Sequence, residues 1–294
     1  MSRGRWTAVH GVVLGLGCVI TAAASAEELQ GTLQIKGSDT MVNLAQAWAE
    51  AFMTTHPTVV VAVTGGGSGT GIAALIAGTC DLAATSRQMK AKELELATSQ
   101  GASPQEWTVA LDGLAVVVHP DNPVRRLTLA QLADLFTGTL QTWQALGGRE
   151  ERVVLLSREV NSGTHVYFKE HVLGASAEGS AREFTPEALL LSSSQAIADE
   201  VAVNRAAIGY YGMGYLNARN VAVSVARTAE GPAVLPSAET VRTGAYPISR
   251  PLFLYTRTSP HGVVQLFLDF VRSSEGQRIV RQEEFVPMAG SEQP

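Results

Sequence analysis

The feature that most constrains the fold of this 294-residue chain is a unit that occurs three times. Each unit is a short apolar run, then a loop rich in glycine, serine and threonine, then an amphipathic stretch, and the three loops are residues 37–40, 65–71 and 158–164. In the first unit, residues 41–56 carry a large apolar side chain at every fourth position, which is typical of a helix. Strands that alternate with helices predict parallel sheets flanked by helices, with ligands at the carboxyl ends of the strands. We therefore expect all three loops at a ligand site.

The third loop has the layout of an anion clamp. Arg158 stands four residues before Ser162, and Ser162, Gly163 and Thr164 open the amphipathic stretch. The N–H groups in the first turn of a helix have no partner inside the helix and attract an anion, while an arginine can hold two oxygens with its planar fork. The same Ser-Gly-Thr pattern is also typical of ordinary helix N-capping. Taken alone, the loop leaves both interpretations open.

The second loop, the glycine run 65–71, fits no better-known glycine motif. It has no register of G-x-G-x-x-G and no lysine that would complete a P-loop, which argues against nucleotide binding. Ser68 does not lie in a nucleophile elbow, because Thr70 stands where the second glycine is required. We interpret Ser68 as a hydrogen-bond donor. No segment places a nucleophile and a base at a recognisable spacing, so a phosphoryl-transfer enzyme is not supported.

The first 26 residues are predicted to be a cleavable signal peptide. Arg3 and Arg5 precede the apolar residues 12–20, and residues 24–26 form a small-x-small cleavage site. The apolar core is too short for a stable membrane anchor, and no later run approaches about 20 apolar residues. Lipid anchoring at Cys18 is the minority interpretation. We expect an exported, periplasmic protein.

The mature chain is predicted to be acidic and to keep a single cysteine. Removal of the leader, which holds two arginines and no acidic residue, takes the formal net charge from −5 to −7. Nucleic acid and anionic membranes are therefore not expected as partners, and anion binding would depend on local geometry. Cys80 follows an apolar stretch, which favours a buried structural thiol. His119, His165 and His171 lack metal-ligand spacing, and no metal or cofactor is expected.

Five segments taken together resemble one known family. They are Gly37-Ser-Asp-Thr-Met41, residues 65–71, Asp81-Leu-Ala-Ala-Thr-Ser-Arg87, residues 112–123 and residues 158–164. Each segment is weak alone, but they occur in the family's order and cover essentially the whole mature chain. On these segments the chain resembles the periplasmic phosphate-binding proteins of phosphate ABC importers, in the type 2 periplasmic-binding-protein superfamily.

The resemblance implies an α/β fold of two lobes, each a mostly parallel sheet flanked by helices. Lobe I would consist of residues 27–116 and 251–294, lobe II of residues 117–250, and crossing strands would join them. The ligand would lie in the cleft between the lobes. Closure of the lobes would bury the anion and give it a higher affinity for the closed state.

The resemblance also implies the residues that contact phosphate. They are Thr40, Met41 through its N–H, and Ser68 in lobe I, and Arg158, Ser162, Gly163 through its N–H, and Thr164 in lobe II. Ser86 is also predicted to bind phosphate, but it departs from the pattern, because some members carry a proton-accepting aspartate at this position. Ser38 and Asp39 are further candidates, and Asp39 is the nearest carboxylate by motif that could replace that aspartate. The favoured interpretation of Asp39 is instead an N-cap of the following helix.

Other elements follow from local patterns. Strands are expected at residues 114–119, 152–156, 207–211, 221–225 and 252–256, and helices at residues 72–77, 129–136 with Thr128 as N-cap, and 263–271. Tyr210 and Tyr211 are expected in the core or the hinge.

These features together imply a function. The resemblance indicates a monomeric, non-enzymatic receptor that captures inorganic phosphate in the periplasm and delivers it to the membrane permease subunits of an ABC importer. Two alternatives stay open: an exported phosphate-binding sensor or adhesion-type module, and a receptor for a related oxyanion.

Overall fold

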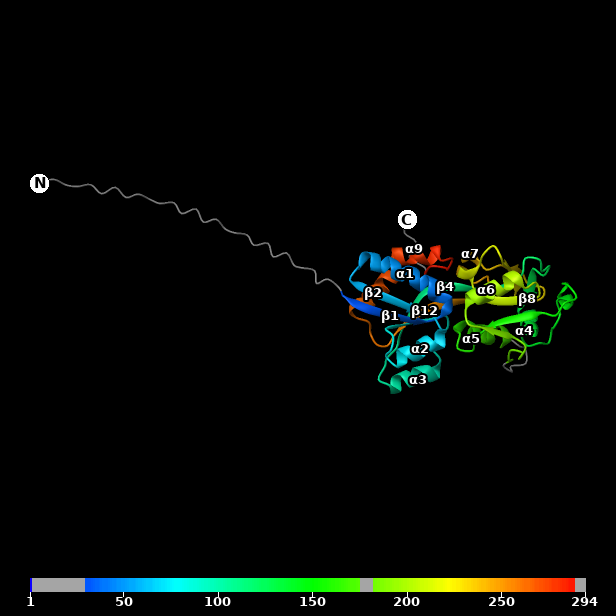
Figure 1. The fold of residues 1–294 in the computed structure, drawn as a ribbon, viewed down its shortest axis with the longest axis horizontal. Helices are drawn as coiled ribbons and strands as arrows, with labels where there is room; N and C mark the ends of the chain where they lie inside the picture. Colours follow the sequence, from blue (N-terminus) through cyan, green and yellow to red (C-terminus); the bar gives the residue numbers. More distant parts are fainter. Residues whose placement is uncertain (2–29, 175–181, 289–294) are drawn as a thin grey trace.

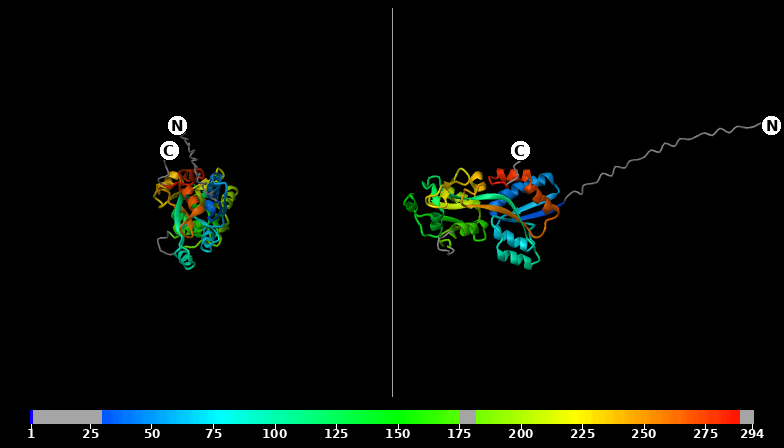
Figure 2. Two further views of the ribbon diagram at one scale, coloured as in Figure 1. Left: turned by 90° about the vertical axis from the view of Figure 1, so that its left-hand side faces the viewer. Right: turned by 180° about the vertical axis from the view of Figure 1, so that it is seen from behind.

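Two α/β lobes lie side by side along the long axis of the molecule (Figure 1). The computed structural model describes Met1 and residues 30–174 and 182–288, so the predicted signal peptide, apart from Met1, lies outside the described residues. One nine-stranded sheet runs through both lobes in the order β2-β1-β3-β12-β4-β8-β6-β7, with β9 paired to β4. Figure 2 shows the two lobes from the side and from behind.

Lobe I is built around a parallel sheet. Its elements are β1 (Gly31–Gly37), η1 (Asp39–Met41), α1 (Val42–Thr55), β2 (Val59–Thr64), α2 (Ser68–Ile76), β3 (Leu82–Thr85), α3 (Ala91–Ser99), β12 (Ser249–Thr256), α8 (Gly262–Arg272) and α9 (Ser274–Gln282). β1 pairs in parallel with β2 and β3. In helix α1 a large apolar side chain recurs at every fourth residue, as predicted, and these side chains, Leu44, Trp48 and Phe52, are fully buried. Removing these large side chains from water stabilises the lobe.

The lobes are joined by β12 and β4 (Gln105–Val118), which pair antiparallel. β4 pairs with β12 as far as Gly113 and with β8 from Leu114 onwards. The strand predicted at residues 114–119 therefore covers only the last five of the 14 residues of β4. The first half escaped prediction because Glu106 and Asp112 interrupt its apolar pattern.

Lobe II combines the other end of the sheet with a smaller one. Its elements are β5 (Arg126–Thr128), α4 (Leu129–Phe136), η2 (Trp143–Leu146), β6 (Val154–Arg158), α5 (Gly163–Phe168), η3 (Lys169–Leu173), β7 (Leu189–Leu191), α6 (Ser194–Val203), β8 (Ala207–Gly212), η4 (Met213–Tyr215), β9 (Val221–Ala222), β10 (Ser224–Ala226), β11 (Ala233–Val234) and α7 (Ala238–Arg242). β6 pairs in parallel with β7 and β8, while β11, β10 and β5 form a separate sheet. Thr128 caps α4 as predicted and accepts the Gln131 N–H at 3.0 Å.

Several elements differ from their predicted bounds, among them β12, which is predicted at residues 252–256 and begins at Ser249. β6 begins at Val154 and ends at Arg158, so the arginine of the third loop is the last residue of a strand. The strand predicted at residues 221–225 is broken into β9 and β10. Helix α2 begins inside the glycine run, at Ser68, directly after Gly67. Gly67 has φ +90°, a backbone conformation that glycine adopts far more readily than other residues.

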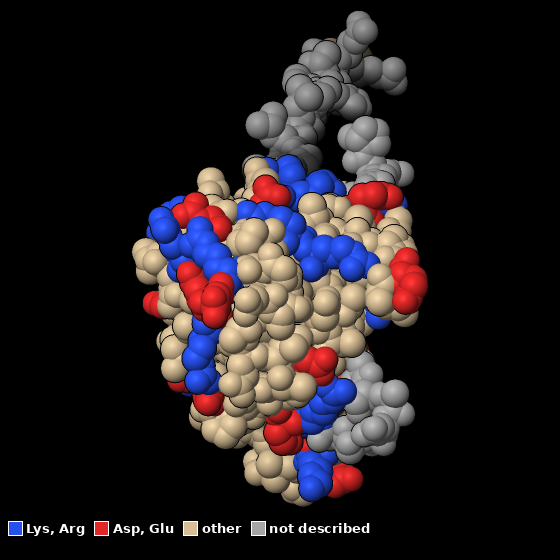
Figure 3. All heavy atoms as spheres, turned by 90° about the vertical axis from the view of Figure 1, so that its right-hand side faces the viewer, with Lys and Arg blue, Asp and Glu red and all other residues tan. Residues whose placement is uncertain are grey.

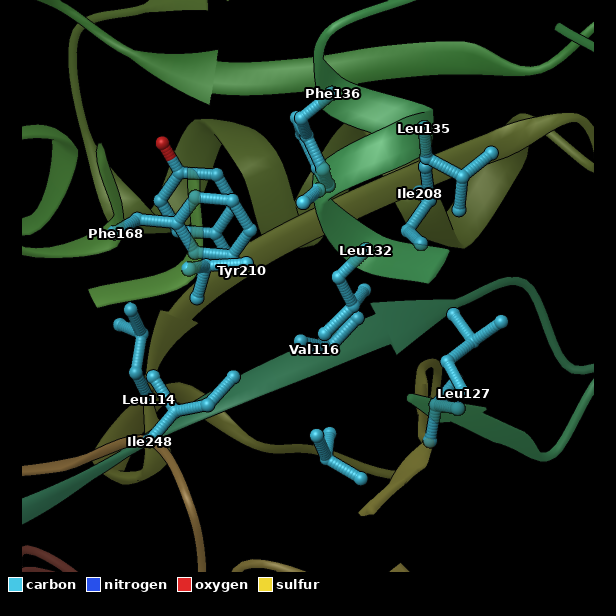
Figure 4. Close-up of a cluster of buried hydrophobic side chains, with 14 of the residues drawn as sticks. Leu114, Val116, Leu127, Leu132, Leu135, Phe136, Phe168, Ile208, Tyr210 and Ile248 are labelled. Carbon is cyan, nitrogen blue, oxygen red and sulfur yellow. The ribbon is translucent and has the colours of Figure 1, made fainter. Parts of the chain in front are cut away.

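The core of lobe II is aromatic and aliphatic. Side chains from β4, β8 and the helices on one face of the sheet converge in it (Figure 4). The rings of Phe168 and Tyr210 stack with centroids 3.9 Å apart, and both residues are fully buried. Tyr211 is also fully buried, so the prediction that the two tyrosines belong to the core is confirmed. Such ring pairs stabilise a core beyond the area they bury.

Two further sequence predictions concern the membrane and the thiol. Among the described residues, no helix is long and apolar enough to cross a membrane. Cys80 is a free, buried cysteine, and burial raises the pKa of its thiol to about 12. The burial of Cys80 agrees with the prediction, and a thiol with so high a pKa is a poor nucleophile.

Candidate functional site

The segments that follow four strands meet between the lobes. In lobe I, η1 follows β1, α2 follows β2 and Ser86 follows β3, while in lobe II α5 follows β6. The candidate residues that are exposed by 3% or less are Ser38, Thr40, Met41, Ser68, Ser86, Arg158, Ser162 and Thr164. Gly163 is buried as well. Buried hydroxyls and a buried guanidinium can donate hydrogen bonds to an anion out of contact with water, so this arrangement suits a bound anion.

Hydroxyl groups of the two lobes approach one another closely. The Oγ1 atoms of Thr40 and Thr164 lie 2.8 Å apart across the cleft. Within lobe I the Oγ atoms of Ser68 and Ser86 are 3.3 Å apart. A Cβ atom built on Gly163 would lie 2.3 Å from the Ser68 Oγ and 2.6 Å from the Ser86 Oγ. Glycine at position 163 is therefore what lets lobe II approach the serines of lobe I.

Arg158 is held in place by hydrogen bonds to other protein groups. In lobe II its Nε donates to the Leu191 carbonyl at 3.2 Å, its Nη2 to the Ser192 carbonyl at 2.8 Å and its Nη1 to the Ser194 hydroxyl at 3.2 Å. Its Nη2 also reaches lobe I and donates to the Asp39 carboxylate at 2.6 Å. A side chain ordered in this way loses little conformational entropy on binding.

The favoured interpretation of Asp39 as an N-cap is wrong. Asp39 is the first residue of η1, and no side chain makes a capping hydrogen bond at that helix. One carboxylate oxygen faces Arg158, and the other accepts the Gly66 N–H at 3.0 Å. A charge-assisted bond to a guanidinium is stronger than a bond to a neutral N–H, which explains why the carboxylate turns toward the cleft.

Two of the implied donors already have partners. The Met41 N–H donates to the Ser38 carbonyl at 3.0 Å, so an anion would have to share it. The Ser162 hydroxyl accepts the Thr164 N–H at 3.2 Å and thus caps α5, but its own proton stays free to donate. For Ser162, capping and anion binding are therefore compatible. In the part of the chain that the structure describes, no hydrogen bond engages the Gly163 N–H.

Sequence reasoning missed a second buried arginine beside these residues. Arg250 of β12 is 2% exposed and donates to the fully buried Asp112 carboxylate through Nε at 3.1 Å and Nη2 at 2.9 Å. The same Nη2 lies 3.0 Å from the Thr164 Oγ1 and 3.4 Å from the Thr40 Oγ1. Burial raises the pKa of Asp112, and the charge of Arg250 opposes that shift. Asp112 opens one of the five family-like segments, which was the available signal, but nothing near Arg250 indicates its partner.

Asn161 was also missed, although it lies inside the third loop. Its side-chain Nδ2 donates to the Gly66 carbonyl at 2.9 Å and to the Thr70 Oγ1 at 3.2 Å. Its backbone carbonyl accepts the Gly69 N–H at 3.0 Å. A Cβ atom on Gly67 would lie 2.9 Å from that carbonyl oxygen. The glycine run of lobe I is thus a surface that receives Asn161 of lobe II.

One serine and one histidine lie close together inside lobe II. The Ser157 Oγ is 3.2 Å from the His165 Nδ1 and 2.6 Å from the Tyr210 hydroxyl. Ser157 is fully buried, and burial lowers the pKa of His165. A hydroxyl enclosed in the lobe II core has no access to a substrate, so the contact is structural. No group of three or more metal-ligating side chains occurs among the described residues.

The surface gives no sign of a broad anion-attracting field on the face that Figure 3 shows. At this end of lobe II, basic side chains lie interspersed with acidic ones (Figure 3). Several form exposed ion pairs in the lobe, such as Arg152 with Glu187 at 2.9 Å and Arg205 with Asp121 at 2.9 Å. Anion binding at the cleft would therefore depend on the buried donors, as the net charge predicts.

Comparisons with known proteins agree with this geometry. A family model described as a PBP superfamily domain matches residues 22–275. The phosphate-binding protein PstS of Pseudomonas aeruginosa is 32% identical over 94% of this chain and 92% of its own length, and PstS of Bacillus subtilis is 31% identical over 91% and 84%. A crystal structure of a putative phosphate ABC transporter substrate-binding protein with bound phosphate, from Clostridium perfringens, has a TM-score of 0.78 and 32% identity, covering 87% of this chain and 99% of that chain.

The fold and the buried donors between the lobes define a two-lobed binding protein. The chain belongs to the PBP superfamily and, within it, to the PstS family.

Proposed function

We propose that this protein binds inorganic phosphate between its lobes and delivers it to the membrane permease subunits of an ABC importer. The observation that carries the proposal is the meeting of buried donors from both lobes: the Thr40 and Thr164 hydroxyls lie 2.8 Å apart, and the Ser68 hydroxyl faces Gly163. Arg158 of lobe II reaches Asp39, the neighbour of Thr40 in lobe I. The PstS names of the relatives and the phosphate in the Clostridium perfringens structure support phosphate as the ligand. We propose further that the receptor is exported to the periplasm, as the predicted signal peptide implies, and that it is a monomer.

The proposed binding step uses donors from both lobes. Hydroxyl and N–H groups would bind the phosphate oxygens, and Arg158 would balance their charge. We place the lobe boundaries near Val116 and Pro251, on the two crossing strands. Because the donors are divided between lobes, phosphate would have a higher affinity for the closed state and would shift the population toward it.

We propose further that the protein is not an enzyme. The relatives are named as binding proteins, and the one serine-histidine contact described above is enclosed in a core. A candidate nucleophile would need a base within hydrogen-bond reach and access to the substrate. Absence of turnover of a chromogenic phosphate ester by the purified protein is the expected result, and turnover that co-purifies with the protein would contradict it.

Calorimetry of the purified mature chain tests the ligand. After removal of co-purified phosphate, the protein is titrated with phosphate, arsenate and sulfate. We expect tight binding of phosphate and weaker binding of sulfate, and failure of phosphate to bind would contradict the proposal. Stimulation of ATP hydrolysis in a reconstituted importer by the loaded protein tests delivery. Phosphate binding without such stimulation would favour a sensor or adhesion-type role.

A further inference from the structure

The buried ion pair between Arg250 and Asp112, on the two crossing strands, contacts residues of the candidate anion site. Arg250 and Asp112 are directly opposite residues in the antiparallel pairing of β12 with β4. Their side chains are 1% and 0% exposed, and the second Asp112 oxygen accepts the Met213 N–H at 3.0 Å. The Arg250 guanidinium also lies over the Tyr167 ring, 5.4 Å from its centroid. The pair is therefore fixed by groups that belong to both lobes and to the strands between them.

Arg250 reaches three of the residues implied as phosphate ligands. Its Nη1 donates to the Ser86 carbonyl at 3.1 Å, and its Nη2 lies within hydrogen-bond distance of the Thr164 and Thr40 hydroxyls. Thr40 and Ser86 belong to lobe I and Thr164 to lobe II. One guanidinium thus contacts the ligand-bearing segments of both lobes at once.

The chemistry of the hydroxyl group gives these contacts a consequence. A hydroxyl has one proton to donate and two lone pairs that accept, whereas a guanidinium can only donate. Each threonine oxygen that accepts from Arg250 must direct its own proton elsewhere. In this structure the two threonine hydroxyls share one such proton between them, at 2.8 Å. An anion at this point would receive hydrogen bonds from both.

We propose that Arg250, positioned by Asp112, is the second cation of the anion site: it orients the Thr40 and Thr164 hydroxyls toward the ligand and adds its charge to that of Arg158. Arg250 is a positioning residue, since it acts through the threonines. The inference rests on the proposed function. It adds Arg250 and Asp112, which are not among the residues predicted to contact phosphate. The competing interpretation is that the pair only holds the crossing strands together.

Opposite changes of charge separate these interpretations. Arg250→Gln removes the cation and leaves the Asp112 carboxylate beside the ligand, whereas Asp112→Asn leaves a buried cation without its counter-charge. An anion would then repel the remaining carboxylate in the first variant and compensate the unpaired cation in the second. A purely structural pair predicts that both variants melt at lower temperature and gain the same increase in melting temperature from phosphate as wild type.

The experiment measures melting temperature and the Kd for inorganic phosphate in the full mature chain, starting with wild type. For Arg250→Gln we expect a Kd raised roughly ten- to a hundredfold and a smaller phosphate-induced increase in melting temperature. For Asp112→Asn we expect a lower melting temperature without phosphate but a larger phosphate-induced increase than in wild type. Arg257→Gln is the matched control, because Arg257 donates to the Ile76 and Gln100 carbonyls in lobe I and should leave the Kd unchanged.

Three outcomes overturn the inference in distinguishable ways. If wild type binds phosphate and the phosphate-induced increase is the same in wild type and both variants, only the role of Arg250 is contradicted. If wild type does not bind phosphate, the proposed function fails and this inference with it. If Arg250→Gln does not fold, Arg250→Lys takes its place: lysine keeps the charge but cannot reach both hydroxyls and the carbonyl at once. A Kd for Arg250→Lys equal to that of wild type would contradict the orienting role.

Discussion

The two lobes supply the candidate site in different ways. Lobe I offers groups from three separate places, after β1, β2 and β3, and most of them are hydroxyls. Lobe II offers nearly everything from one seven-residue segment, residues 158–164, that begins at the end of β6 and continues into α5. The positive charge of this segment is locked by lobe II itself, through the Leu191 and Ser192 carbonyls and the Ser194 hydroxyl.

This difference indicates how binding energy is divided between the lobes. A preformed charged clamp on one lobe can hold an anion weakly while the cleft is open, and the hydroxyls of the other lobe complete its coordination on closure. We therefore expect loss of the Arg158 cation in lobe II to nearly abolish binding, and loss of a single hydroxyl in either lobe to weaken it. The predictions below test this division.

The largest effect is expected for Arg158→Ala. A buried anion that loses this cation should lose about 3–5 kcal/mol of binding free energy, which is several hundred-fold or more in Kd. Calorimetry with phosphate measures the loss, and circular dichroism checks that the fold is intact. Arg152→Ala is the matched control, because Arg152 is an exposed arginine of the same lobe, paired with Glu187. An unchanged Kd in Arg158→Ala would remove Arg158 from the site.

A smaller loss of phosphate affinity, of similar size in both variants, is expected for Ser68→Ala in lobe I and Thr164→Ala in lobe II. A hydrogen bond to a charged group contributes about 1.5–3 kcal/mol, so each Kd should rise roughly ten- to 150-fold. Both hydroxyls are fully buried, so solvent exposure does not distinguish them. The comparison is between the two calorimetric Kd values. If only one of the two variants binds phosphate more weakly, the ligand is not shared between the lobes.

Sequence reasoning succeeded where the signal was local. The three strand-loop-helix units, the cap at Thr128 and the core tyrosines all depend on residues within one or two turns of each other, and periodicity and turn chemistry report such features. Gly163 belongs to this group, since a Ser-Gly-Thr turn before a helix is visible in the chain itself. Reasoning from local sequence also explains why the prediction for Asp39 was wrong. It favoured a helix N-cap, which depends on neighbouring residues, whereas the actual partner of Asp39 is Arg158, 119 residues away.

The residues that escaped prediction interact over long distances in the sequence. Asp112 and Arg250 are 138 positions apart, and Asn161 is 95 positions from Gly66. Their contacts depend on the pairing of β4 with β12 and on the closure of the lobes, and neither is encoded in a short window. A buried ion pair also breaks the apolar pattern by which strands are predicted, so β4 was shortened at the place where it carries Asp112.

Selectivity between phosphate and sulfate should respond to Asp39→Asn. The Asp39 carboxylate contacts Arg158 at 2.6 Å, so it lies beside the group that would hold the anion. Near neutral pH phosphate still carries a proton and can donate a hydrogen bond to a carboxylate, whereas sulfate carries no proton and is repelled. We expect the ratio of sulfate Kd to phosphate Kd to fall by about tenfold, which corresponds to about 1.4 kcal/mol.

Competition binding with the two anions measures this ratio. Asp121→Asn is the control, because Asp121 is an exposed carboxylate of lobe II that pairs with Arg205. An unchanged ratio in Asp39→Asn, with both affinities altered equally, would show that the carboxylate holds Arg158 but does not distinguish the two anions.

The smallest effect is expected for Asn161→Ala, which tests whether the lobes also hold each other without the ligand. The Asn161 amide donates to Gly66 and Thr70 only when lobe II meets the glycine run, so its loss should destabilise the closed state and leave the open state unchanged. Exposed hydrogen bonds contribute about 0.5–1.5 kcal/mol, so we expect phosphate to dissociate roughly two- to tenfold faster, with the sulfate-to-phosphate ratio and the melting temperature of the phosphate-free protein unchanged. Stopped-flow dissociation measures the rate, and Val160→Ala is the control, because Val160 is the exposed neighbour in the same loop. A dissociation rate equal to that of wild type would mean that closure depends on the ligand and the buried donors alone, and the contribution of the glycine run would then be limited to letting the two backbones approach.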